Sequence, residues 1–267
     1  MIGLIAFTVL TVTGRQPRLR GVKHNELFGL FLGSFLVWMM SPIERLLVGR
    51  VSANAITAVS LLLCALTGVA AATGHLTGAC WMFAVAGILD VLDGRLARLN
   101  GQQTAAGALF DSVSDRWGEL LALGGYIWFL KDSPWMFAAL GALGASQMVS
   151  YTRARAESLG LDLRGGMMQR AERVVLISAG TLAAAWYGAN PETFGAVVPI
   201  LGGVLLICAI ASTGTALNRW YVAYRELARR AEKPVVIEDT PAQPQMAFSV
   251  PAKLRESAEL APAAPRI

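Results

Sequence analysis

Hydrophobic residues in this chain are gathered into long runs separated by polar segments. Several runs approach the roughly 20 residues that a helix needs to cross the hydrocarbon of a bilayer. We predict six membrane-spanning helices from them, with boundaries good to several residues. The predicted spans cover residues 55–73, 77–92, 107–130, 134–152, 174–189 and 196–218. The pattern therefore predicts an all-α polytopic membrane protein with six transmembrane helices.

Two further apolar stretches precede the first span. Residues 2–12 are too short to cross a membrane and lack the positive residues that precede the core of a signal peptide. Residues 27–40 have basic residues on both flanks, with Lys23 before them and Arg45 after them. Basic flanks at both ends favour a helix that lies in the membrane interface.

Composition agrees with this layout and suggests three regions. Only 15% of the residues are charged, whereas a soluble domain carries about 25%. Many of the prolines fall between Pro234 and Pro265 among Ala, Glu and Ser, a composition typical of disorder. We expect an N-terminal segment with an interfacial helix at 1–50, a six-helix transmembrane domain at 51–220 and a largely disordered cytoplasmic tail at 221–267.

Basic residues give the orientation. With six spans, 22 of the 23 Lys and Arg residues fall on one side of the membrane, and Lys131 alone lies opposite. By the positive-inside rule that side is cytoplasmic, so both termini are expected there, in the cell (inner) membrane. The net charge of +5 is explained by topology and by anionic lipids. No basic and aromatic module indicates a nucleic-acid partner.

The three cysteines suggest no chemistry. Cys64, Cys80 and Cys208 lie inside apolar segments, without the spacing of metal ligands. They are expected to be small buried side chains and neither disulfides nor ligands.

Four aspartates stand at the cytoplasmic ends of the second and third spans. Asp90 and Asp93 are three residues apart, and Asp111 and Asp115 are four apart, so each pair projects from one helix face. The short linker between the pairs lets all four carboxylates converge. Like charges repel, but hard divalent cations bind carboxylates together with substrate phosphates, and two such ions can clamp a diphosphate.

Two alternative roles for the aspartates stay open at this point. A single acidic pair at a helix end more often caps a helix or forms an ion pair. Intramembrane acids also mark the ion path of cation-coupled transporters. Those acids are expected near the bilayer midplane on broken helices, whereas these lie at one face of the membrane.

The complete spacing resembles a known signature. Asp90-x-x-Asp93-Gly94-x-x-Ala97-Arg98, eight residues and Gly107-x-x-x-Asp111-x-x-x-Asp115 match the motif of the CDP-alcohol phosphotransferase (CDP-alcohol phosphatidyltransferase) family. The resemblance covers about residues 41–220. It implies six transmembrane helices around a cytoplasm-facing polar cavity, usually in a homodimer, and a divalent metal site, with Mg²⁺ or Mn²⁺ and two ions expected.

The resemblance also assigns roles. The metal ligands would be Asp90, Asp93, Asp111 and Asp115, and Asp115 would also act as general base on the acceptor hydroxyl. The cytidine diphosphate pocket would be formed by Asn54, Thr57, Gly94, Ala97, Arg98 and Gly107. The family often has Pro-Asn-x-x-Thr before the first span, and here Ala53 replaces the proline. Helix capping is the alternative role of Asn54 and Thr57.

Arginines between the fourth and fifth spans indicate the acceptor. Arg153 and Arg155 end one helix, and Arg170 and Arg173 begin the next. Part of this positive charge is explained by the excess of basic residues in cytoplasmic loops. Convergent arginines can also bind a phosphate monoester through forked hydrogen bonds. An acceptor with its own phosphate is therefore expected.

The surrounding sequence resembles one branch of the family. "YTRARAESLGL", "RAER" and "FDSVSDR" are similar to the phosphatidylinositol-phosphate and archaetidylinositol-phosphate synthases. Glycerol-phosphate members tend to have proline and lysine where this chain has Ser112 and Arg116. The branch commonly has Glu-Arg where this chain has Gln169 and Arg170. The resemblance implies transfer of a phosphatidyl group from CDP-diacylglycerol to inositol phosphate, with release of CMP. The alternatives are glycerol 3-phosphate as acceptor and, in another class, a cation-coupled membrane transporter.

Overall fold

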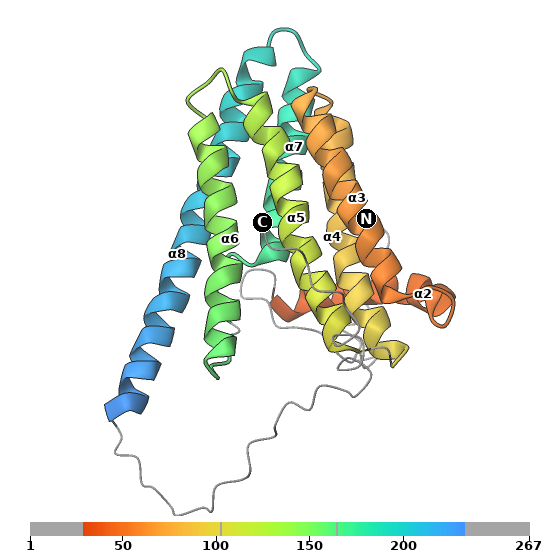
Figure 1. The fold of residues 1–267 in the computed structure, drawn as a ribbon. Helices are drawn as coiled ribbons and strands as arrows, with labels where there is room; N and C mark the ends of the chain where they lie inside the picture. The colour runs from red at the N-terminus through yellow and green to blue at the C-terminus, as the bar shows by residue number, and fades with distance from the viewer. Residues whose placement is uncertain (1–28, 102, 164, 233–267) are drawn as a thin grey trace, which may run out of the picture. The chain divides into compact units, whose positions relative to one another are not determined.

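The computed structural model describes residues 29–101, 103–163 and 165–232, and all regular structure in these ranges is helical (Figure 1). The predictions for residues 2–12 and for the tail beyond 232 lie outside the described residues. The helices are α2 (Gly29–Leu47), α3 (Ala53–Ala72), α4 (Leu76–Leu99), α5 (Ala105–Phe129), α6 (Met136–Ser158), α7 (Arg170–Gly188), the short 3₁₀ helix η1 (Phe194–Ala196) and α8 (Val197–Glu232). The chain divides into two compact units after Glu226, and the packing and the site described below lie in the first.

Each predicted span coincides with one helix, from α3 to α8. Among the described residues, three segments are long and apolar enough to cross a membrane by length and composition, namely α3, α4 and Phe194–Ala231. The all-helical class and the membrane character are thus supported, and the count of six spans stays a prediction.

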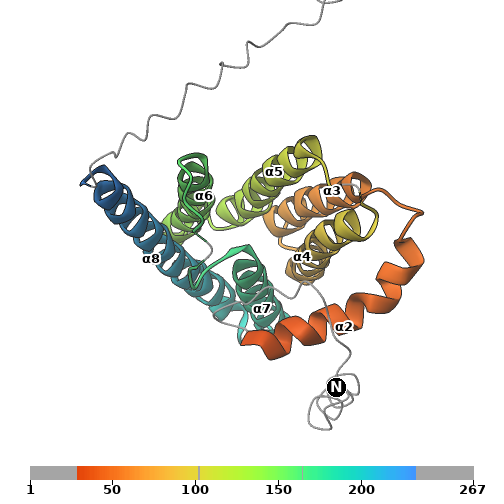
Figure 2. The same ribbon diagram turned by 90° about the horizontal axis from the view of Figure 1, so that it is seen from below.

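Short turns bring α3, α4 and α5 side by side. Gly74 has φ +79° in the turn between α3 and α4, and Gly101 has φ +63° between α4 and α5, a conformation that glycine adopts without strain. Thr104 caps α5 by accepting a hydrogen bond from the Gly107 amide at 3.0 Å. α3 packs against both α4 and α5, and the views in Figures 1 and 2 agree on this arrangement.

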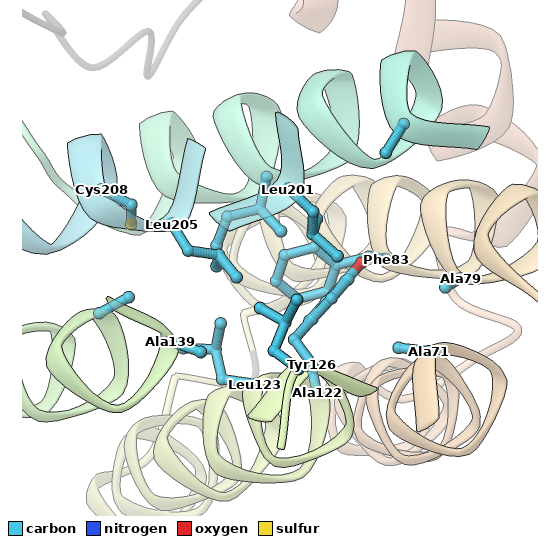
Figure 3. Packing of buried hydrophobic residues seen from close by; sticks show 14 of the residues in the cluster. Ala71, Ala79, Phe83, Ala122, Leu123, Tyr126, Ala139, Leu201, Leu205 and Cys208 are labelled. Atoms are coloured by element: carbon cyan, nitrogen blue, oxygen red, sulfur yellow. The ribbon is translucent and has the colours of Figure 1, made fainter. Parts of the chain in front are cut away.

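Small residues allow α3 and α5 to approach closely. A Cβ atom on Gly125 would lie 2.0 Å from the Gly68 carbonyl oxygen, so no larger residue fits there without a shift of the helices. The interhelical core beside this contact contains Phe83, Leu201 and Tyr126 (Figure 3). The Tyr126 hydroxyl lies 2.9 Å from the Thr181 hydroxyl, which satisfies the buried polar end of the ring.

The expectation that the cysteines are buried and form no disulfide is confirmed, since Cys64, Cys80 and Cys208 are free and buried.

α2 runs across one end of the helices that follow it, and not along them (Figure 2). Its buried Glu44 forms an ion pair with Arg95 of α4. Asn100, just after α4, accepts a hydrogen bond from the Gly49 amide at 3.0 Å and donates one to the Val51 carbonyl at 3.3 Å. These contacts fix the turn from which α3 begins. That α2 lies in the membrane interface stays a prediction.

Candidate active site

Three aspartates of α4 and α5 converge, although the two helices pack mainly against α3 and not against each other. Carboxylate oxygens of Asp90, Asp93 and Asp111 all lie within 4.8 Å of one another. Asp93 is buried and accepts a hydrogen bond from the Thr57 hydroxyl of α3 at 2.7 Å. Three carboxylates this close form the hard oxygen donor set that a divalent cation such as Mg²⁺ or Mn²⁺ takes, so the residues fit a metal.

Asp115 joins this group through an arginine. It lies one turn after Asp111 on α5, and its carboxylate pairs with the Arg170 guanidinium. The same guanidinium nitrogen also pairs with Asp90. Arg170 is the first residue of α7, so a helix far along the chain brings a positive charge between two of the four aspartates. This charge offsets part of the repulsion among the carboxylates.

A cavity of about 290 Å³ lies beside the aspartates, between the first turns of α3 and α5 and the last turns of α4. Asp93 and Asp111 form part of its wall. The lining also contains all six residues expected to form the nucleotide pocket: Asn54, Thr57, Gly94, Ala97, Arg98 and Gly107. Residues from three helices thus surround one space next to the carboxylates.

Two glycines of the motif serve this cavity differently. A Cβ atom on Gly107 would lie 3.1 Å from Oγ1 of Thr104, the N-cap of the same helix, and 3.5 Å from Asn54 Oδ1, so the cap leaves little room there. A Cβ atom on Gly94 would meet only Arg98 Nη1, at 3.8 Å. Gly94 therefore keeps open space in the cavity wall, where a ligand can approach the backbone.

The four arginines expected at the acceptor site are placed differently from one another. Arg153 pairs with Glu157 one turn later on α6, at 2.8 Å, and Arg155 is exposed. Arg170 reaches the aspartates. Arg173 is only 2% exposed and pairs with Glu119 of α5, with Nε 3.1 Å from Oε1.

Several polar residues near the site were not predicted from the sequence. Glu119 and Arg219 are buried, and the sequence predicted no role for either side chain. A charged residue inside an apolar run is itself a signal, because such groups face protein partners and not lipid. Glu119 carried that signal inside the predicted span 107–130.

These features define the class of protein. The chain belongs to the CDP-alcohol phosphatidyltransferase family, whose model matches residues 50–217. Within that family it is similar to the phosphatidylinositol phosphate synthase of Mycobacterium marinum, at 34% identity over 153 residues, which are 55% of this chain and 62% of that relative. It is also similar to the archaetidylinositol phosphate synthase of Methanothermobacter thermautotrophicus, at 37% identity over 149 residues, 54% of this chain and 71% of that relative. The match therefore spans less than two thirds of the mycobacterial relative's own length.

Solved structures of similar proteins share the fold. The Mycobacterium tuberculosis phosphatidylinositol phosphate synthase with bound CDP-DAG matches with a TM-score of 0.59 and 28% identity, over 70% of this chain and 94% of that one. The same synthase in complex with manganese and citrate matches with a TM-score of 0.59 and 28% identity, over 69% of this chain and 88% of that one.

Proposed function

We propose that this chain transfers a phosphatidyl group from CDP-diacylglycerol to inositol phosphate, forming phosphatidylinositol phosphate and CMP. The observation that carries the proposal is the cavity in which all six motif residues adjoin the aspartate cluster, with Arg170 beside it. The family assignment and the names of the similar synthases support the same reaction.

The aspartates would hold the metal. Asp90, Asp93, Asp111 and Asp115 would bind Mg²⁺ or Mn²⁺, with two ions expected, and the manganese complex of the similar synthase supports this assignment. When bound, divalent cations neutralise the diphosphate and the leaving phosphate. The Thr57 hydroxyl would keep the Asp93 carboxylate oriented through its 2.7 Å hydrogen bond.

The cavity would receive the cytidine diphosphate of the donor. Arg98 would provide positive charge, the Asn54 amide would donate and accept hydrogen bonds, and Gly94 would leave room for close approach. The diacylglycerol chains would extend into the surrounding lipid. CDP-DAG bound to the similar synthase supports this donor.

The reaction would be an in-line displacement. The acceptor hydroxyl oxygen would attack the β-phosphorus of the donor, while the bond from that phosphorus to the oxygen bridging to CMP breaks. Asp115 would take the hydroxyl proton on its carboxylate, and CMP would leave with the bridging oxygen. The protein's part is mainly to position the two substrates and to stabilise charge, as in other phosphoryl transfers.

The acceptor phosphate would be bound by the arginines of α6 and α7. Arg153 and Arg155 would approach it from the end of α6, and Arg170 from the start of α7. Arg173 belongs to the same set, but its buried pair with Glu119 suggests that it acts by holding the start of α7 in place. We further propose that the site and both termini are cytoplasmic, that the protein lies in the cell membrane, and that it forms a homodimer. The distribution of basic residues supports the orientation.

The test is CMP release by the purified protein with CDP-diacylglycerol and either Mg²⁺ or Mn²⁺. Inositol phosphate, glycerol 3-phosphate, serine and free inositol are supplied one at a time, and Asp115→Asn is the control. We expect release with inositol phosphate and its loss in Asp115→Asn. Release with glycerol 3-phosphate alone would keep the reaction class and discard the inositol phosphate assignment. No release with any acceptor would favour the transporter alternative.

A further inference from the structure

Glu44 of α2 and Arg95 of α4 form a buried ion pair close to the cavity proposed for the donor. Glu44 is 5% exposed, and the Arg95 side chain is 12% exposed. Arg95 Nη2 donates a hydrogen bond to Glu44 Oε2 at 3.1 Å, and Arg95 Nε donates one to Glu44 Oε1. Because two parallel hydrogen bonds between planar groups permit only one geometry, the pair fixes how α2 lies against α4 at this point.

An apolar cluster adjoins the ion pair and joins three helices. Met40 of α2, Ile56 of α3, and Leu92 and Leu96 of α4 are its buried members. Met40 lies one turn before Glu44, and Leu92 lies one turn before Arg95, so the cluster and the ion pair share one interface. Removing either charge would leave the other one uncompensated beside apolar side chains, which disturbs such an interface.

Arg95 lies on the side of α4 that faces away from the cavity. Asp93 and Ala97, two residues before and two residues after it, both line the cavity. Two residues correspond to about 200° around a helix, so Arg95 projects from nearly the opposite side. The Arg95 guanidinium therefore lies behind the cavity wall, where it can act on a bound ligand only through the position of α4.

The end of α2 is also joined to the α3 wall of the cavity. The Val48 amide donates a hydrogen bond to the Glu44 carbonyl at 2.9 Å, and the Val51 amide donates one to the Leu47 carbonyl at 3.1 Å, so the turn after α2 is closely held. This turn leads directly into the first residues of α3, where Asn54 lines the cavity. Glu44 is thus connected to α3 through the backbone and to α4 through its side chain.

We propose that Glu44 and Arg95 are positioning residues for the CDP-linked donor. Together they set the separation between the first turn of α3 and the last turns of α4, and with it the width of the cavity that receives the cytidine diphosphate. This inference rests on the proposed function. The arginines proposed to bind the acceptor belong to α6 and α7, which the pair does not join. Loss of the pair should therefore weaken binding of the donor and leave binding of the acceptor unchanged.

The test compares the KM for CDP-diacylglycerol with the KM for the acceptor in steady-state CMP release. Glu44→Gln keeps the shape of the side chain and removes its charge. Arg45→Gln is the matched control, because Arg45 is an exposed charged residue of the same helix. We expect Glu44→Gln to raise the CDP-diacylglycerol KM by at least about tenfold, since misplacement by about 1 Å can cost roughly a hundredfold. The acceptor KM should stay within about twofold of wild type, and Arg45→Gln should leave both KM values unchanged.

Combining substitutions tests whether the two residues act through one contact. Arg95→Gln should raise the CDP-diacylglycerol KM as Glu44→Gln does. The double variant should raise it no further than the larger single effect, because each substitution already breaks the same pair. If the two effects multiplied instead, to roughly a hundredfold, the residues would act separately and the inference would be wrong.

The same preparations separate this inference from the proposed function. CDP-diacylglycerol is the donor with every acceptor in the series, so the comparison holds for whichever acceptor wild type uses. If wild type releases no CMP, the proposed function fails, and hydrogen exchange decides whether the pair holds the turn before α3. We expect faster exchange at the Val51 amide in Glu44→Gln than in wild type or Arg45→Gln. An equal rise of both KM values, an unchanged CDP-diacylglycerol KM or unchanged exchange would overturn the inference. If Glu44→Gln does not fold, Glu44→Asp, which keeps the charge on a shorter side chain, gives the same test with a smaller expected rise.

Discussion

The ion pair between Glu119 and Arg173 permits a direct test of which arginines bind substrate and which support the fold. The Arg173 side chain is 3% exposed and the Glu119 side chain 6%. Arg173 also donates to the Met168 carbonyl at 3.2 Å. We expect Arg173 to act on the acceptor site through these contacts and not by touching the acceptor phosphate.

The loss of stability expected when one partner of this ion pair is removed follows from the burial of both side chains. Removing one partner of a buried ion pair leaves an uncompensated charge and costs about 3–5 kcal/mol. In membrane proteins the unfolded state also finds polar partners, so we expect the lower end, about 3 kcal/mol, for Glu119→Leu or Arg173→Met. This corresponds to roughly a hundredfold change in the folding equilibrium. The double variant removes both charges and should lie within about 1 kcal/mol of wild type, the remaining loss being the hydrogen bond to Met168.

The assay is unfolding in mixed detergent micelles for wild type, both single variants and the double variant. A coupling free energy of at least about 2 kcal/mol between the two positions is expected. CMP release by the double variant should stay within about tenfold of wild type, because the arginine's loss shifts the Met168 segment only slightly. If Arg173 itself bound the phosphate, the acceptor KM of the double variant would rise roughly a hundredfold, as for other buried charge pairs that lose one partner. That result, or an Arg173→Met protein as stable as wild type, would refute the reasoning.

Other contacts give sharper local predictions. Gly125→Ala should lower the unfolding free energy by about 1–3 kcal/mol through overpacking, whereas Gly124→Ala, whose Cβ would meet no atom within 4 Å, should change it little in the same unfolding assay. Asp93→Asn should abolish Mn²⁺ binding measured by electron paramagnetic resonance. Thr57→Val should weaken Mn²⁺ binding by about tenfold, because the Thr57 hydroxyl orients the Asp93 carboxylate. Unchanged Mn²⁺ binding in Asp93→Asn would show that Asp93 is not a metal ligand. Asn100→Ala should raise the CDP-diacylglycerol KM several-fold and leave the acceptor KM unchanged, because the Asn100 side chain holds the turn before α3 through two hydrogen bonds. A rise in the acceptor KM with an unchanged CDP-diacylglycerol KM would contradict this prediction.

The sequence predicted much of the fold because apolar run length reports directly on helix position in membrane proteins. Each predicted span coincides with a helix, but the ends differ where polarity changes. α8 continues to Glu232, well past the predicted end at 218, because a polar continuation of a helix gives no hydrophobic signal. α2 likewise runs to Leu47, through Pro42, beyond the apolar stretch that ended at residue 40.

The convergence of three aspartates was predictable for a different reason. Spacings of three and four residues place side chains on one helix face, and a short linker keeps the ends of the two helices within reach of each other while both pack on α3. Asp90, Asp93 and Asp111 meet as those rules require. The partners of Glu119 and Arg219 were not predictable, because they depend on which faces of α5, α7 and α8 meet and, for Arg219, on backbone carbonyls that have no residue-specific signal.

The two halves of the site are built on different parts of the fold, and this has a consequence for specificity. The cavity proposed for the donor is lined by α3, α4 and α5, and several turns further along α3 and α5 are held close together at Gly68 and Gly125. The arginines proposed to bind the acceptor come from α6 and from the start of α7, and the segment before α7 is held by side chains of α7 and α8. Arg170 joins the halves through its pairs with Asp90 and Asp115. A change in residues 165–168 or in their contacts on α8 can therefore alter how the acceptor is held without moving the donor cavity.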